Sequence, residues 1–137
     1  MAAATAARED KRQDGILVEY PVKASTALYK GTMIVDLGTG YASNGTDGSG
    51  YTFLGVAYES ADNSAVATDG AKTVRIWKSG VFEFNKASAV QTDIGTAAYI
   101  TDNQTVAAST TNSVLAGYIV GVPSSTKVLV RIDLAAK

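Results

Sequence analysis

The stretch that most constrains the fold is residues 73–84, Thr-Val-Arg-Ile-Trp-Lys-Ser-Gly-Val-Phe-Glu-Phe. Its side chains alternate between two faces on each side of residues 78–80, which is the period of a half-buried strand. Because Lys-Ser-Gly is short and polar and its glycine tolerates a positive φ, the pattern predicts a tight hairpin. The stretch also holds the only tryptophan and two of the three phenylalanines, so we expect the core or a subunit contact there. The two predicted faces are Val74 and Ile76 against Arg75 and Trp77, then Phe82 and Phe84 against Val81 and Glu83.

Short apolar runs separated by glycine-rich polar links continue along the whole chain. The links carry turn dipeptides such as Asn44-Gly45 and Asp69-Gly70, and no segment has a convincing helical stripe. Helix is expected at most in the first residues and in one turn near residues 92–96. The spacing predicts an all-β protein, a small compact barrel or sandwich of short antiparallel strands. The expected strands are residues 16–20, 27–29, 33–37, 51–59, 73–77, 81–84, 97–101, 105–108, 114–122 and 127–134.

The chain divides into a short polar segment and one β-rich body. Residues 1–15 have helix propensity but no apolar stripe to bury, so we expect a flexible N-terminal arm. Such an arm is either an idle tail or a tether that orders on a partner. At 137 residues and 14.2 kDa, residues 16–137 are expected to form a single body with its own core.

A weak internal echo runs through the strand pattern. Residues 27–29, 40–43, 54–57 and 73–76 resemble, in order, residues 97–99, 105–108, 116–119 and 129–132. A duplicated strand set with shortened loops gives such an echo, and so does chance similarity among short β runs. If the echo is real, Arg75 and Arg131 are equivalent outward positions.

Composition narrows the function. The chain has no histidine and no cysteine, which excludes Ser-His-Asp and Cys-His catalysis, disulfides and ordinary zinc or iron sites. Its formal net charge is -1, without a large basic cluster, and no apolar run approaches the length of a membrane span, so we expect neither nucleic acid nor membrane as a partner. We expect no enzyme activity, no cofactor and no metal, and a protein that is soluble as made. The glycine-rich residues 44–50 are interpreted as a flexible hairpin tip, and a carboxylate pair or a modified carrier lysine at Lys78 are weaker alternatives.

A surface with few charges indicates self-association. Charged residues make up 18% of the chain and hydrophobic residues 46%, so strand edges and outward aromatic rings are most simply protected by a second copy. We therefore expect a homo-oligomer.

Several segments, taken in order, resemble the capsid cement (head decoration) proteins of tailed bacteriophages. The resemblance covers roughly residues 18–134, and its weight lies in the order and spacing of the pieces. The most telling pieces are Asp62-Asn63-Ser64 after Leu-Gly-Val-Ala, the Gly-Val-Phe of residues 80–82, and Tyr-Ile-Thr-Asp-Asn-Gln-Thr-Val at residues 99–106. The other pieces are residues 22–31, 40–42, 54–57, 70–74, 93–95 and 116–117.

The resemblance implies a virion protein that is made in the bacterial host cytoplasm and binds the outer surface of the assembled, expanded head. Its partners would be the major capsid protein and itself, commonly as a homotrimer that bridges neighbouring capsid subunits. The Ala-rich arm of residues 1–15 leads directly into the apolar alternation of residues 16–20. This arrangement favours the N-terminal segment as the capsid-contacting element. The predicted capsid-binding residues are Arg8, Lys11, Arg12, Ile16, Val18 and Tyr20, and the predicted subunit contact is Trp77, Phe82 and Phe84.

The alternative function is a β carbohydrate-binding or tail-fibre adhesion module. In that case outward Trp77, Tyr51 and Tyr58 would form a platform for stacking sugars.

Overall fold

A computed structural model describes Ala6 and residues 15–137, and the regular secondary structure of these residues is almost entirely β. The predicted fold class is confirmed, whereas the arm predicted for residues 1–15 lies almost wholly outside the described residues. Two of the strands, β4 and β6, were not predicted from the sequence; each is only three residues long. The elements are β1 (Leu17–Pro21), β2 (Thr26–Leu28), β3 (Met33–Asp36), β4 (Ala42–Asn44), β5 (Thr52–Ala57), β6 (Ala61–Asn63), β7 (Thr73–Trp77), β8 (Val81–Asn85), the 3₁₀ turn η1 (Gln91–Asp93), β9 (Ala97–Asp102), β10 (Thr105–Ala107), β11 (Leu115–Ser124) and β12 (Lys127–Arg131).

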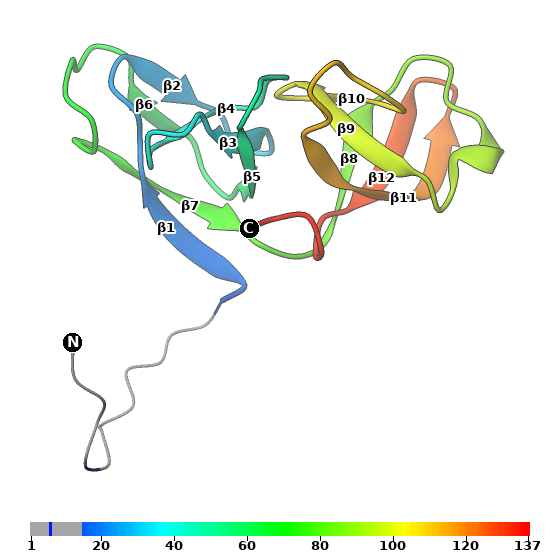
Figure 1. Cartoon of the computed structure of the whole chain (residues 1–137), viewed down its shortest axis with the longest axis horizontal. Coiled ribbons are helices and arrows are strands. Elements are labelled where there is room, and N and C mark those ends of the chain that lie inside the picture. Colours follow the sequence, from blue (N-terminus) through cyan, green and yellow to red (C-terminus); the bar gives the residue numbers. More distant parts are fainter. Residues whose placement is uncertain (1–5, 7–14) are drawn as a thin grey trace.

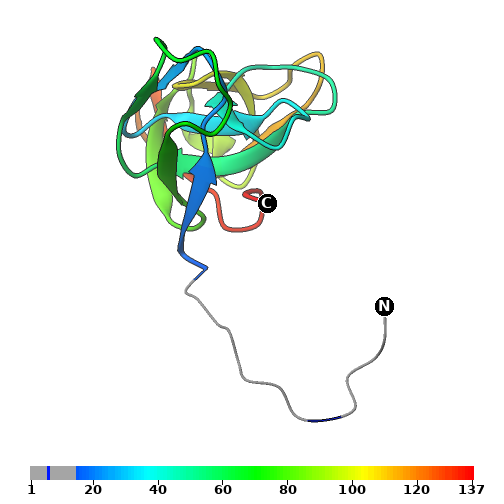
Figure 2. The same ribbon diagram turned by 90° about the vertical axis from the view of Figure 1, so that its left-hand side faces the viewer.

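The strands form two barrel-like halves, which lie side by side along the long axis of the molecule (Figures 1 and 2). In the N-terminal half the sheet order is β1-β7-β5-β3-β4, and its two edges meet at a parallel bridge between Val22 and Ala42. In the C-terminal half β10-β8-β12-β11-β9 close into a barrel. We call these halves the N-terminal and C-terminal barrels. The small β2–β6 sheet belongs to the N-terminal barrel.

The hairpin predicted for residues 73–84 is wrong. β7 pairs with β1 and β5 in the N-terminal barrel, whereas β8 pairs with β12 and β10 in the C-terminal barrel. Residues 78–80 are therefore the connection between the barrels. The alternation of faces is correct in both strands, since Val74 and Ile76 are buried against exposed Arg75 in β7, and Phe84 is buried against exposed Glu83 in β8. A short polar link with a glycine serves a hairpin and an inter-barrel connection equally well, so local sequence did not separate the two.

The two barrels repeat one topology. Read from β8, the second has the order β8-β12-β11-β9-β10, which matches β1-β7-β5-β3-β4 of the first strand for strand. The loop hydrogen bonds recur as well. The corresponding pairs are Lys78 N to Ile16 O and Ile132 N to Gly80 O; Val22 N to Lys72 O and Lys86 N to Thr126 O; Gly31 N to Ala57 O and Gly95 N to Ile119 O; and Ala57 N to Thr32 O and Ile119 N to Thr96 O.

The internal echo of the sequence is therefore structural. Three of its four segment pairs fall on equivalent strands, namely β4 with β10, β5 with β11 and β7 with β12. The first pair does not, because residues 27–29 overlap β2 while residues 97–99 belong to β9, the equivalent of β3. The strand register makes Arg131 equivalent to Trp77, because each lies opposite the residue that follows a glycine at a β-bulge, Gly55 or Gly117. The predicted equivalence of Arg75 and Arg131 is therefore wrong.

A bulge glycine occupies the same place in both barrels. Gly55 has φ +143° and Gly117 has φ +152°, and a Cβ on either would lie 2.0 Å from Trp77 O or 2.1 Å from Arg131 O respectively. Only glycine allows this close approach of neighbouring strands together with this backbone conformation.

One large core joins the barrels. β3 and β5 are buried on both faces: Ile34 and Leu54 point into the N-terminal barrel, while Met33 and Phe53 belong to a cluster that continues through the interior of the C-terminal barrel. Trp77, Phe82 and Phe84 all lie in or against this larger cluster, as expected for the largest apolar side chains. Its buried members are Met33, Val35, Phe53, Val56, Phe84, Ala89, Ala98, Ile100, Val106, Val114, Ala116, Ile119, Val128, Val130, Ile132 and Ala135.

Polar contacts also join the two barrels. The Asn103 carbonyl in the β9–β10 turn accepts a hydrogen bond from the Met33 N–H at 2.8 Å, and the Asn103 amide donates to Asn44 Oδ1 at 3.2 Å. Asp47 Oδ1 accepts from Thr110 Oγ1 at 3.1 Å and from the Asn112 N–H at 3.2 Å. Polar segments that are distant in sequence therefore fix the orientation of one barrel against the other.

A buried asparagine secures the loops around β2 and β6. Asn63 is fully buried, and its Nδ2 donates to the carbonyls of Lys23 at 3.0 Å and Thr68 at 3.2 Å. The neighbouring Asp62 carboxylate accepts from Ser64 N at 2.9 Å and Ser64 Oγ at 2.5 Å, and the Ser64 hydroxyl lowers the Asp62 pKa. The Asp-Asn-Ser motif thus has a structural role in this chain.

Candidate partner-binding edge

β1 is an edge strand whose hydrogen-bonding direction can be read from its two ends. Lys78 N donates to Ile16 O at 2.7 Å, and Val22 N donates to Lys72 O at 2.9 Å. Because hydrogen-bonded pairs alternate with non-hydrogen-bonded pairs in an antiparallel ladder, the even-numbered residues of β1 bond to β7. The odd-numbered residues turn their backbone groups the other way.

The outward backbone groups of β1 belong to Leu17 and Glu19. Farther along, Lys23 N uses the same direction to reach Ala42 O at 3.0 Å, where β4 closes the barrel. β4 begins at Ala42 and, because this bridge is parallel, runs away from Leu17 and Glu19; the sheet order places no strand beside them within residues 15–137. In Figure 1 this part of β1 extends below the body of the N-terminal barrel. It is an open strand edge of the kind that pairs with another chain.

The predicted capsid-binding side chains of β1 share one face, and that face is turned toward the core. Val18 and Tyr20 lie opposite Ile76 and Val74, both fully buried, and are themselves half-buried, while Ile16 remains 50% exposed. The other three predicted residues, Arg8, Lys11 and Arg12, lie outside the described residues. The groups that sequence reasoning missed are the backbone at Leu17 and Glu19. Strand parity predicts their direction, but only the sheet order shows that the edge is open.

Lys78 fastens β1 to the rest of the molecule. Its ammonium lies 4.8 Å from the centre of the Tyr20 ring and donates to Tyr20 Oη at 2.7 Å, to Leu54 O at 2.5 Å and to an oxygen of Lys137 at 2.7 Å. Donors of an ammonium group are fully used by three such partners. Lys78 is therefore held by contacts within the protein, whereas a carrier lysine would be presented on a free turn.

An aromatic and charged cluster covers the outer face of β7 next to β1. Arg75 forms a bidentate pair with Glu59, Nε to Oε2 at 2.8 Å and Nη2 to Oε1 at 2.9 Å, and its guanidinium lies 4.8 Å from the centre of the Tyr58 ring. The side-chain hydrogen bond from Arg75, with its backbone N–H and its charge, lowers the Glu59 pKa to about 2. Trp77 meets the Tyr58 ring edge to face, with 5.2 Å between centroids and 71° between planes. Because Arg75 covers the Tyr58 ring and Trp77 meets it at an angle, Tyr58 and Trp77 form no flat platform for stacking sugars.

The three residues predicted to form the subunit contact differ in accessibility. Phe84 is 3% exposed and fills the C-terminal barrel, so it has no surface to offer another chain. Trp77 and Phe82 are half-buried against the same core, and a subunit contact through them stays a prediction.

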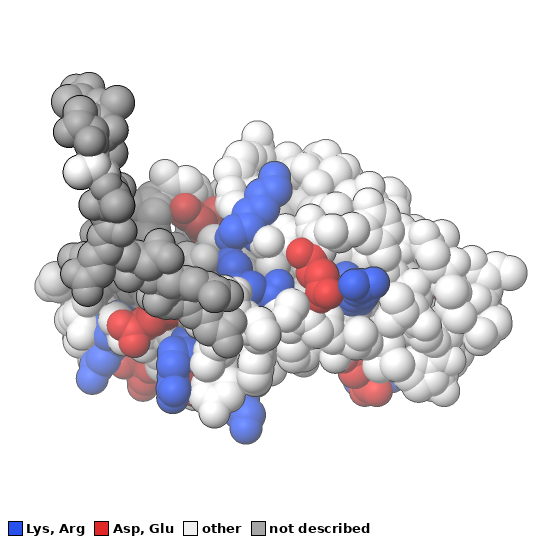
Figure 3. Space-filling model, turned by 90° about the horizontal axis from the view of Figure 1, so that it is seen from below, with Lys and Arg blue, Asp and Glu red and all other residues white. Residues whose placement is uncertain are grey.

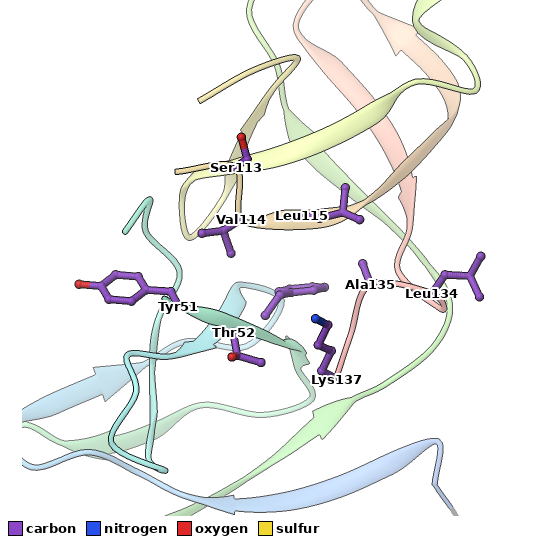
Figure 4. A pocket seen from close by; sticks show the side chains of 9 residues that line it. Tyr51, Thr52, Ser113, Val114, Leu115, Leu134, Ala135 and Lys137 are labelled. Atoms are coloured by element: carbon purple, nitrogen blue, oxygen red, sulfur yellow. The ribbon is translucent and has the colours of Figure 1, made fainter. Parts of the chain in front are cut away.

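A hollow at the junction of the barrels has a volume of about 190 Å³ (Figure 4). Thr52 lies on one side of it, Val114 on the other, and the segment from Ala135 to Lys137 borders it. Its lining contains no carboxylate side chain, and no group of acidic residues in the described part of the chain is arranged to hold a metal ion. Among the same residues no helix has the length and apolar character needed to cross a membrane.

Known proteins give no further identification. No protein-family model, curated protein or solved structure matches this chain.

Proposed function

We propose that this chain is a phage capsid decoration protein, which binds the outside of the assembled, expanded head and bridges neighbouring major capsid proteins. The observation that carries the proposal is the open edge of β1, where the backbone groups of Leu17 and Glu19 face away from β7 and no strand of residues 15–137 lies beside them. A capsid strand pairing there would gain main-chain hydrogen bonds without a preformed pocket. The resemblance of residues 18–134 to cement proteins supports the same assignment.

Stabilisation in this proposal follows from mass action. A protein that binds only the expanded shell shifts the equilibrium toward that shell in proportion to its saturation. Because many copies bind one lattice, each contact can be modest, and bridging by a homotrimer multiplies it. The protein would then be found on the virion surface in a simple ratio to the major capsid protein.

The proposal is tested by binding to purified expanded heads that lack this protein. Glu19→Pro removes one outward N–H of β1 and leaves the bonds to β7 in place, since proline is tolerated at edge positions that point away from the sheet. Loss of that hydrogen bond and the obstruction by the ring should weaken binding about tenfold or more, because a net 1.4 kcal/mol is tenfold in Kd.

Two controls separate edge pairing from charge and from folding. Glu19→Ala removes the carboxylate and keeps the N–H, so it should bind heads as wild type does. Glu83→Pro places the same change at the equivalent position of β8, opposite Leu129, and should bind heads normally. Normal head binding by folded Glu19→Pro would refute the β1 edge as the docking element. Absence of the wild-type chain from purified virions would refute capsid decoration itself.

A further inference from the structure

The repeated topology allows the outer faces of the two barrels to be compared residue by residue. The outer face of β3 and β5 in the N-terminal barrel corresponds to the outer face of β9 and β11 in the C-terminal barrel. The bulge glycines Gly55 and Gly117 fix the register, because they lie opposite Ile34 and Ala98 respectively. The equivalent pairs are Met33 and Ala97, Val35 and Tyr99, Phe53 and Leu115, and Val56 and Tyr118.

In the N-terminal barrel this face is covered by the C-terminal barrel. Met33, Val35 and Val56 are 0% exposed and Phe53 is 3% exposed. The cover consists of the β9–β10 turn, whose Asn103 bonds to Met33, and of the last residues, where Lys137 N donates to Phe53 O at 2.9 Å. A barrel of this fold therefore already uses the face as a binding surface for a second barrel of the same fold.

In the C-terminal barrel the equivalent face is more exposed: Ala97, Tyr99 and Leu115 are half-buried, and Tyr118 is exposed whereas its counterpart Val56 is fully buried. Tyr118 is 42% exposed, Val120 44% and Leu134 85%, and together with Arg131 they line a hollow of about 130 Å³. We call Tyr118, Val120 and Leu134 the bare face.

The bare face has little charge with which to select a charged partner. Arg131, its one cation, is paired through Nε with Asp133 Oδ2 at 3.2 Å. In the view from below, the far end of the molecule that the C-terminal barrel forms shows no charged residue (Figure 3). An exposed apolar surface with little charge marks a site of protein–protein interaction.

We propose that a second copy of this chain covers the bare face with its N-terminal barrel. The C-terminal barrel's own covering surface, the β9–β10 turn with the last residues, is already occupied within its chain. Among residues 15–137, the equivalent surface left on a second copy is therefore on its N-terminal barrel. That surface is the β3–β4 turn at residues 37–40, the counterpart of the β9–β10 turn. Asp36 Oδ1 holds this turn by accepting from Gly38 N at 2.8 Å and Thr39 N at 2.9 Å, and its tip is exposed.

Such a contact is head to tail, because the bare face of one copy meets a different surface of the next. Repetition of a head-to-tail contact closes into a ring when the rotation permits, and a three-membered ring is the simplest form that agrees with the expected homotrimer. The contact does not depend on capsid binding, so it stands or falls separately from the proposed function.

The test is the oligomeric mass of the full chain, measured by analytical ultracentrifugation from micromolar to submillimolar concentration. Wild type should reach a multiple of 14.2 kDa, and Tyr118→Glu should return the mass to that of one chain. Val120→Asp is a second variant on the same face and should do the same. Tyr29→Glu is the matched control, since Tyr29 is 59% exposed but lies outside the bare face and the 37–40 turn, and it should keep the wild-type mass.

The outcomes are distinct. A monomeric wild type at every concentration overturns the proposal, and so does an oligomer whose mass neither substitution changes. Circular dichroism and urea unfolding of each variant establish that a loss of mass comes from a folded protein. Because heads are absent from this experiment, an oligomer that later fails to bind heads would refute the proposed function alone.

Discussion

Replacing Gly55 by alanine should destabilise the protein more than any other single added methyl group in the N-terminal barrel. The new Cβ would lie 2.0 Å from Trp77 O and 2.8 Å from Ile76 Cγ2, both below the 3.0 Å that real Cβ contacts respect. A non-glycine residue in this φ region costs about 1–3 kcal/mol, and moving a packed backbone to relieve the collision costs a further 1–3 kcal/mol or so. The expected loss is therefore about 4 kcal/mol, out of a total of about 5–15 kcal/mol for a domain.

The assay is urea unfolding followed by the fluorescence of the single tryptophan, with thermal unfolding as a second measure. A loss of about 4 kcal/mol in a chain of 137 residues lowers Tm by roughly 10–15 °C. Gly117→Ala should lose a similar amount, because its Cβ would lie 2.1 Å from Arg131 O. Gly31→Ala is the control: its φ is +82°, but no atom lies within 4 Å of the added Cβ, so only about 1–2 kcal/mol should be lost. The reasoning is refuted if Gly55→Ala is no less stable than Gly31→Ala.

Two further predictions concern polar contacts. The Glu59 pKa is lowered by Arg75 from 4.5 to about 2, so the pair stabilises the fold fully above pH 4.5 and loses its contribution as the pH falls through about 2. Since both side chains are partly exposed, Glu59→Gln should lower the free energy of unfolding by about 0.2–1 kcal/mol at pH 7, and the difference from wild type should shrink toward pH 2 in urea titrations; an unchanged difference at both pH values would contradict this account. Asp47→Ala should cost about 0.5–1.5 kcal/mol, because it removes the acceptor of partly exposed hydrogen bonds from Thr110 and Asn112 at the junction of the barrels. Hydrogen exchange should show faster exchange at the Asn112 amide, and exchange as slow as in wild type would count against a junction role for Asp47.

Much of the fold was predictable because it depends on local alternation. Val74 and Ile76 inward against Arg75 outward is a period of two that any half-buried strand requires, and it holds whichever strands lie beside it. The partner of a strand is a different matter. Residues 78–80 satisfy the requirements of a hairpin, yet β7 finds β1 and β5, because those pairings bury both faces of β5 between the two barrels.

The candidate site was only partly predictable for the same reason. The apolar alternation at Ile16, Val18 and Tyr20 correctly identified a strand, but it marked the face that packs on the core. The groups open to a partner are backbone atoms of Leu17 and Glu19, and backbone atoms have no sequence signature. Tyr118 and Val120 were predicted to lie in a strand, but their exposure became meaningful only through comparison with Val56, whose equivalent position is buried.

The division into two barrels joined by residues 78–80 also sets the order in which the protein completes itself during synthesis. Every strand of the N-terminal barrel precedes residue 78, so that barrel can form while the rest of the chain is still being made. Until the C-terminal barrel has folded, the N-terminal barrel exposes an apolar patch on the nascent chain, formed by Met33, Val35, Phe53 and Val56. During synthesis the protein therefore passes through a stage in which this apolar patch of its N-terminal barrel is most prone to aggregation. Folding of the C-terminal barrel onto the patch ends that stage.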